Sequence, residues 1–188
     1  MNENFKKLIS ETENLGEIAE LLMDSTELLS NISHYQKNPF DTLFSKSKHK
    51  VKINFNKKGD TIYLLGNYKE NESDNSSDLE IIYDAIDKEL VISAHTINGK
   101  GLYFALLEAC SINRVGFDIT SDSEMDEKEF LFNDSINAVL VSVSGDKESK
   151  FVDFIYNNGL DITLLGHVTK GELRMDDLSF GYISDYTE

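Results

Sequence analysis

The spacing of apolar residues at the start of the chain is helical. Within residues 13–32, apolar side chains recur at intervals of three, four and seven, which predicts an amphipathic helix that must dock on another element. These side chains are Leu15, Ile18, Leu22 and Leu29. Residues 31–50 contain the only proline, Pro39, and several turn-forming residues, so we expect an irregular connection there. We therefore divide the chain into residues 1–50, a helix and connection, and residues 51–188, an α/β domain.

From Val51 onward the pattern is typical of strands. Apolar and polar residues alternate over 51–55, which predicts a half-buried strand. The sequence KKGD at 57–60 suits a turn, and TIYLLG at 61–66 is apolar on both faces. We expect a hairpin whose second strand lies deeper in the sheet.

The remainder of the chain alternates between predicted strands and predicted helices. The helix over 102–112 is apolar on nearly every side, so other elements must cover most of it. Interleaved strands and helices predict an α+β (α/β layered) fold, a mixed β-sheet with helices packed on it. Strands are expected at 90–94, 115–119, 137–143, 161–168 and 171–178, the last two forming a closing pair around a turn at 169–171, and further helices at 79–88, 123–130 and 146–159.

Composition excludes several classes of protein. The chain has 188 residues, of which 40% are hydrophobic, enough for a folded core. A net charge of −16 and a pI of about 4.6 give an acidic surface that repels nucleic acid. No apolar run approaches the ~20 residues of a membrane span, the start has no secretion signal, and Cys110 is the only cysteine. We expect a cytoplasmic protein with no membrane contact, disulfide or structural zinc.

One loop carries the candidate chemistry. The predicted strand delivers His95 to a glycine-containing loop that opens the helix at 102. Backbone N–H groups at a helix N-terminus favour an anion, and Lys100 adds a positive charge. The loop has neither the P-loop nor the dinucleotide-binding pattern, so an ordinary strand-to-helix turn is the alternative. The predicted phosphate-binding residues are His95, Thr96, Asn98, Gly99, Lys100 and Gly101; no catalytic or metal-binding residue is predicted.

The same segment resembles a family motif. Residues 93–109, SAHTINGKGLYFALLEA, are similar to SAHDxSDGGLxxALxE in phosphoribosylformylglycinamidine synthase, and residues 55–66, FNKKGDTIYLLG, are similar to its FKKEGDxIYLLG. Short matches follow in the same order at 116–119, 131–135 and 164–173, so the likeness spans about 51–178. The chain departs from the family at Thr96 (Asp in the family), Asn98 (Ser), Lys100 (Gly) and Asp134 (Glu).

The resemblance implies the C-terminal domain of the superfamily that includes aminoimidazole ribonucleotide synthase. The complete enzyme is an ATP-dependent ligase of purine biosynthesis that uses ATP and Mg²⁺ to convert an amide into an amidine with glutamine-derived ammonia. This chain would help to bind a ribonucleotide or nucleotide phosphate. Its partners would be the ATP-binding domain or a glutamine amidotransferase.

Residues 1–50 contain nothing like the family's ATP-binding half. We therefore expect the chain to be inactive alone and to hold no cofactor by itself, either as a C-terminal piece of a longer protein or as a standalone relative that has lost catalysis. The alternative is a non-catalytic, degenerate interaction or oligomerisation domain of the same fold, for example a homodimer.

Lysines alternate with other residues from Lys46 to Lys52, and Lys57 and Lys58 follow with no acid in between. On a strand, the first four would share one face. We expect a protected edge strand, since lysines there block unwanted pairing. Contact with phosphate or with an acidic partner is the alternative.

Overall fold

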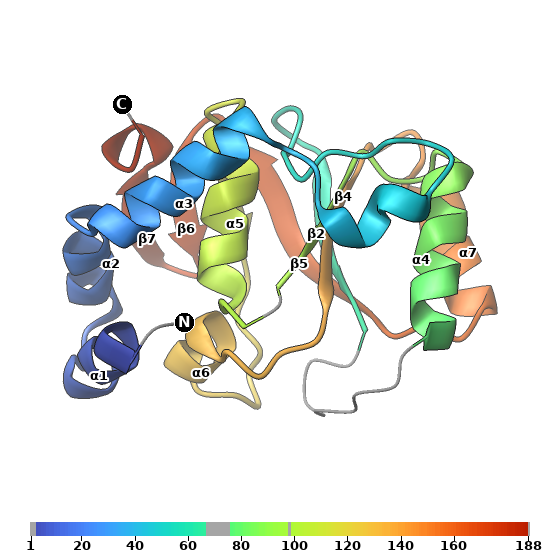
Figure 1. Ribbon diagram of the computed structural model, residues 1–188. Coiled ribbons are helices and arrows are strands. Elements are labelled where there is room, and N and C mark those ends of the chain that lie inside the picture. Colours follow the sequence, from blue (N-terminus) through green and yellow to red (C-terminus); the bar gives the residue numbers. More distant parts are fainter. Residues whose placement is uncertain (1–2, 67–75, 98, 188) are drawn as a thin grey trace.

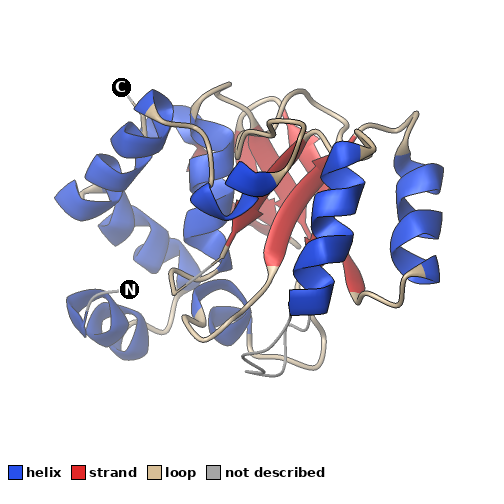
Figure 2. Ribbon diagram, turned by 45° about the vertical axis from the view of Figure 1, so that its right-hand side comes forward, coloured by secondary structure: helices blue, strands red, loops and turns tan. Residues whose placement is uncertain are grey.

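The protein is built on a mixed seven-stranded sheet that has helices on both faces (Figures 1 and 2). The computed structural model describes residues 3–66, 76–97 and 99–187. The strand order is β2-β4-β1-β5-β3-β6-β7. This confirms the predicted α+β class. The strands are β1 (Thr61–Leu65), β2 (Ser93–Thr96), β3 (Gly116–Ile119), β4 (Val139–Val143), β5 (Ile162–Thr169), β6 (Glu172–Met175) and β7 (Leu178–Tyr182).

Helices from distant parts of the chain cover the sheet. None of those in the described part of the chain is long and apolar enough to cross a membrane. The helices are α1 (Glu3–Glu11), α2 (Leu15–Met23), α3 (Thr26–Lys37), α4 (Ser76–Asp87), α5 (Leu102–Ser111), α6 (Glu127–Phe132) and α7 (Glu148–Asn157), with short 3₁₀ helices η1 (Thr42–Lys46) and η2 (Ile183–Asp185).

Two hydrophobic cores lie on opposite faces of the sheet, because successive side chains of a strand point in opposite directions. In β1, Ile62 and Leu64 belong to the core under α5, whereas Tyr63 and Leu65 belong to the core under α4 and α7. Every residue of β1 is buried, as expected for a strand deep in the sheet. Every residue of α5 is also buried, which confirms that this helix is covered on all sides.

The N-terminal segment differs from its prediction. Three helices occupy residues 3–37 in place of one helix and an irregular connection, because Asn14 and Ser25 interrupt the segment. Each accepts a hydrogen bond from a backbone N–H of the next helix and so starts α2 or α3. Apolar residues of α2 and α3 share one core with α5. The division of the chain at residue 50 stays a prediction.

The predicted hairpin before β1 is wrong. Val51, Ile53 and Phe55 are buried and Lys52 is exposed, as the alternation indicated. However, Ile53 N–H donates to Pro39 O and Phe55 N–H donates to Ala109 O, each at 2.9 Å. Because the backbone bonds go to these distant partners, the segment pairs with the sheet only at an isolated bridge between Lys52 and Ser93.

The predicted closing pair of strands is also wrong. β5 and β6 do not pair with each other; β3 lies between them, antiparallel to β5 and parallel to β6. Gly116 permits this, because a Cβ there would come within 2.6 Å of Gly171 C and 2.5 Å of Thr169 Oγ1. The sequence analysis also missed β7, which pairs with β6.

Both outer strands have covered edges. Along β2, Ala94 N–H donates to Lys52 O and Thr96 N–H donates to Asp41 Oδ2. At the other edge, the Tyr182 N–H in β7 donates to Asp185 Oδ2. The expectation that the lysine segment forms an edge strand is wrong: the segment lies beside the edge strand β2 and meets it only at the bridge between Lys52 and Ser93.

Candidate functional site

His95 lies at the centre of a buried charged cluster. It stands in β2, and its Nε2 lies 2.6 Å from Glu108 Oε2 on α5, while its Nδ1 lies 3.2 Å from Asp41 Oδ2. The His95 and Glu108 side chains are both 1% exposed. Each ring nitrogen of His95 therefore faces a carboxylate. The carboxyl groups of Asp41 and Glu108 are both largely buried, where a polar group without a partner would be costly.

Asp41 collects hydrogen bonds from several directions. Its Oδ2 accepts from Thr96 N–H at 2.9 Å and from the Thr96 hydroxyl at 2.7 Å, and its Oδ1 accepts from Leu43 N–H at 3.0 Å. Burial opposes ionisation of Asp41, but the hydrogen bonds from His95, Thr96 and Leu43 outweigh it and hold its pKa well below the usual range. The carboxylate therefore ties the segment before η1 to the end of β2.

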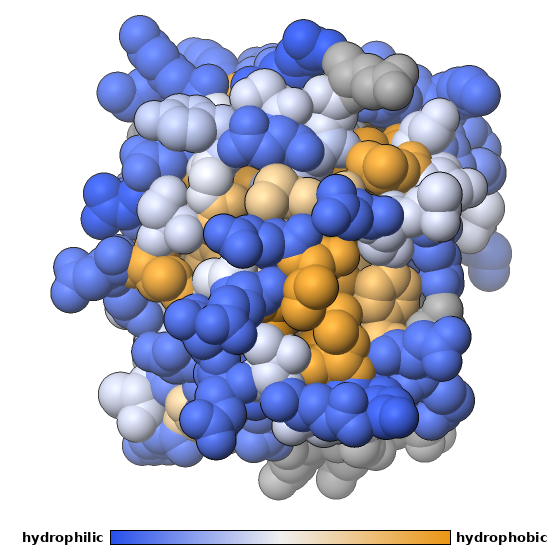
Figure 3. Space-filling view, turned by 90° about the vertical axis from the view of Figure 1, so that its left-hand side faces the viewer, coloured by the Kyte–Doolittle hydropathy of each residue, from blue (hydrophilic) through white to orange (hydrophobic). Residues whose placement is uncertain are grey.

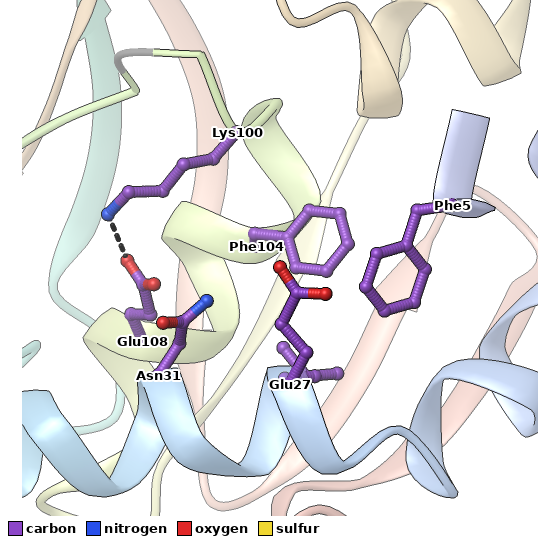
Figure 4. Close-up of a pocket in the computed structure, with 7 residues that line it drawn as sticks. Phe5, Glu27, Asn31, Lys100, Phe104 and Glu108 are labelled. Atoms are coloured by element: carbon purple, nitrogen blue, oxygen red, sulfur yellow. Dashed lines mark hydrogen bonds and ion pairs between the residues drawn. The ribbon is translucent and has the colours of Figure 1, made fainter. Parts of the chain in front are cut away.

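Lys100 closes the cluster (Figure 4). Its Nζ donates to Glu108 Oε2 at 2.8 Å and to the Tyr35 hydroxyl at 2.7 Å, and it lies 4.5 Å from the centre of the Tyr35 ring. Burial works against the charged amine, but Glu108 and Tyr35 outweigh it and raise the pKa of Lys100. The Lys100 ammonium thus pairs with the Glu108 carboxyl group, which also contacts His95.

The structure brings together part of the predicted phosphate loop. His95, Thr96 and Lys100 join the cluster, Gly99 is exposed, and Asn98 lies outside the described residues. Gly101 begins α5 with φ of 87°, and a Cβ there would come within 2.9 Å of Leu131 O. The N-terminus of α5 is thus covered by the backbone of α6. Phosphate binding by the loop stays a prediction.

Three residues of the cluster were not predicted as site residues. Tyr35 and Asp41 lie in the segment that the sequence analysis assigned to an irregular connection. Glu108 could have been predicted from the sequence. It is the only charged residue in an otherwise apolar helix, and a buried charged residue needs a partner. The described residues contain no group of three or more His, Cys, Asp and Glu side chains placed to hold a metal ion.

Cavities adjoin the cluster. One of them measures about 510 Å³ and is lined by His34, Tyr35, Asn38, Phe40, Asp41, Thr42, Leu43, Thr96 and Lys100. A neighbouring, mainly apolar cavity of about 320 Å³ shares Asn38, Phe40, Asp41 and Thr42 with it. Both sizes fall within the range of small-molecule sites. A smaller pocket of about 120 Å³ lies between α1, α3 and α5, where the rings of Phe5 and Phe104 meet (Figure 4).

Asp41 should make the protein sensitive to acid. Because its pKa is lowered on folding, its contribution to stability is complete above the unfolded-state value near 4 and is lost as the pH falls. We expect the free energy of unfolding to drop by about 2 kcal/mol more between pH 5 and pH 2.5 in the natural chain than in Asp41→Asn. Urea unfolding across this range measures the difference. Asp177→Asn, at an exposed aspartate, is the control, and parallel pH profiles for the natural chain and Asp41→Asn would contradict the prediction.

Comparisons with known proteins agree with the fold. No family model matches the chain. The chain is 31% identical over 90 residues to phosphoribosylformylglycinamidine synthase subunit PurL of Leuconostoc mesenteroides, which covers 36% of this chain but only 12% of that enzyme. The chain therefore spans about an eighth of the length of this curated relative.

Comparison with solved structures also indicates a PurL-like fold. PurL of Thermotoga maritima complexed with ATP superposes with a TM-score of 0.63 at 15% identity, covering 73% of this chain and 27% of that one. Thiamine-monophosphate kinase of Stenotrophomonas maltophilia superposes with a TM-score of 0.53 at 12% identity, covering 69% of this chain and 54% of that one. The chain therefore has a PurL-like fold.

Proposed function

We propose that this chain is a ligand-binding domain of the phosphoribosylformylglycinamidine synthase type, which holds the phosphate of a ribonucleotide or nucleotide. One observation carries the proposal. Lys100 uses two of its three N–H donors on Glu108 and Tyr35, which leaves one without a partner among the described residues, and Lys100 lines the cavity of about 510 Å³. An anion in that cavity would complete the coordination of the ammonium group.

Other groups around the cavity suit a phosphate. His34 and Asn38 are exposed at its margin, and Thr96 lines it. Asp41 also lines it, but its charge faces His95 and its oxygens already accept hydrogen bonds from Thr96 and Leu43. Repulsion of a phosphate by Asp41 is therefore reduced. Structures of T. maritima PurL complexed with ATP, ADP and FGAR support a phosphate-bearing ligand for this fold.

We propose that the chain does not catalyse the ligase reaction alone. The titratable side chains of the cluster make hydrogen bonds and ion pairs with one another. The chain also covers only 27% of T. maritima PurL. ATP-dependent conversion of an amide into an amidine would require an ATP-binding domain, with ATP and Mg²⁺, and a glutamine amidotransferase partner to supply ammonia.

A thermal-shift titration tests ligand binding. We expect formylglycinamide ribonucleotide, ADP or ATP to raise the melting temperature, since a ligand at one hundred times its Kd adds about 2.7 kcal/mol of stability. His34→Ala/Asn38→Ala should reduce the shift, and Lys37→Ala, at an exposed neighbour that does not line the cavity, should not. Lys100→Ala is a poorer probe because it also removes a partner of Glu108. If none of the three ligands moves the melting temperature, the proposed function fails.

The alternative is a non-catalytic interaction domain. Figure 3, which faces α1 and α2, shows apolar side chains gathered in a hollow that hydrophilic residues surround. Leu21 on α2 and Leu29 on α3 are 48% and 39% exposed. A dimer in sedimentation equilibrium that is indifferent to all three ligands would favour this alternative.

A further inference from the structure

Phe40 is an exposed aromatic ring on a fixed segment of backbone. Its side chain is 42% exposed. On one side of it, Pro39 O accepts from Ile53 N–H at 2.9 Å. On the other side, Asp41 is held by Thr96, His95 and Leu43. The backbone on both sides is therefore anchored while the ring remains accessible. A ligand that packed on the ring would need to order little of the backbone, which reduces the entropy cost of binding.

Phe40 also stands where the two cavities meet. It lines the polar cavity together with Lys100, Thr96 and His34. It lines the apolar cavity together with Phe44 and Val51. A ligand whose anionic end lies at Lys100 therefore has an apolar wall available at its other end.

We infer that Phe40 determines specificity by stacking against a flat heterocycle joined to the phosphate of the ligand. This inference rests on the proposed function, because it takes the anion at Lys100 as given. A nucleobase stacks on an aromatic ring, and this contact adds to the affinity without any hydrogen-bond readout. Phe40 lies outside residues 51–178, the part of the chain that resembles the synthase, so the N-terminal segment would supply selectivity of its own.

Two ligands that share a phosphate and differ in the base test the inference. AMP and ribose 5-phosphate are titrated by calorimetry into the natural chain and into Phe40→Ala. We expect the natural chain to bind AMP about 5- to 100-fold more tightly than ribose 5-phosphate. In Phe40→Ala this ratio should fall close to one, while the affinity for ribose 5-phosphate stays the same. Tyr156→Ala, which removes an aromatic side chain that is 78% exposed, is the matched control and should keep the full ratio.

Phe40→Trp gives a direct optical readout, because the natural chain has no tryptophan. A base stacked on the introduced indole should quench its fluorescence, and ribose 5-phosphate should leave it unchanged. A far-ultraviolet spectrum equal to that of the natural chain checks the fold of this variant.

The outcomes separate the two proposals. A preference for AMP that disappears in Phe40→Ala, with quenching in Phe40→Trp, supports stacking. If AMP and ribose 5-phosphate bind the natural chain equally well, or if the preference survives in Phe40→Ala, the role of Phe40 is overturned while the phosphate site stands. If neither ligand binds the natural chain, the role of Phe40 is overturned, and the thermal-shift titration with formylglycinamide ribonucleotide, ADP and ATP decides whether the proposed function falls with it.

Discussion

Glu108→Ala should lower the free energy of unfolding by about 3–5 kcal/mol, the loss that follows when one partner of a buried ion pair is removed. Glu108 Oε2 accepts from both His95 and Lys100, and the Glu108 side chain is 1% exposed. Without this carboxylate, the Lys100 ammonium would lose its ion-pair partner and His95 Nε2 would lose its hydrogen-bond partner. Urea unfolding at pH 7, followed by circular dichroism, measures the loss.

A double-mutant cycle separates the charge effect from the loss of volume. The double variant Glu108→Ala/Lys100→Met should lose less stability than the sum of the two single substitutions. The reason is that the ammonium group left unpaired by Glu108→Ala is absent from the double variant. Glu127→Ala, at an exposed position of α6, should change stability by less than about 0.5 kcal/mol. Additive losses in the cycle would show that Glu108 contributes packing and not charge balance.

Gly116→Ala should have an effect of similar size through a different mechanism. The new Cβ would come within 2.6 Å of Gly171 C and 2.5 Å of Thr169 Oγ1, and it would also meet Glu172 O. Because two of these are backbone atoms, one in the turn before β6 and one at the start of β6, a rotamer change cannot relieve the clash. We expect a loss of about 3 kcal/mol or more, since overpacking at rigid sites is costly.

Thermal unfolding of Gly116→Ala and of a second glycine variant, Gly145→Ala, checks this prediction. Gly145→Ala is the matched control, because a Cβ there would have no atom within 4 Å and Gly145 has an ordinary backbone conformation. That substitution should be neutral or slightly stabilising, because it restricts the unfolded chain. Equal melting temperatures for Gly116→Ala and Gly145→Ala would show that β3 can move away from the turn.

Local patterns predicted those elements whose environment is uniform. All residues of β1 and α5 are buried, so an apolar run was sufficient to identify both. Residues 51–55 show the limit of this reasoning. Their alternation correctly predicted which side chains are buried, but Pro39 and Ala109 take the hydrogen bonds that a strand would have used. The insertion of β3 between β5 and β6 has the same origin, because strand partners are chosen by tertiary packing.

Only part of the candidate site could be predicted from local patterns. His95, Thr96 and Lys100 were predicted because they lie within six consecutive residues. Asp41 and Tyr35 were not, since Asp41 is 55 residues from Thr96 and Tyr35 is 65 residues from Lys100 along the chain. A hydrogen bond across such a separation leaves no periodicity in the sequence.

Asp41 has two structural roles, and acid weakens both of them. The carboxylate that contacts His95 Nδ1 also accepts a hydrogen bond from the backbone N–H of Thr96 at the outer edge of β2. When acid neutralises it, both the contact with His95 and the hydrogen bond from Thr96 weaken, because a neutral carboxyl group is a poorer acceptor than a carboxylate. Acid would thus loosen the outer edge of β2 and the charged cluster in a single step.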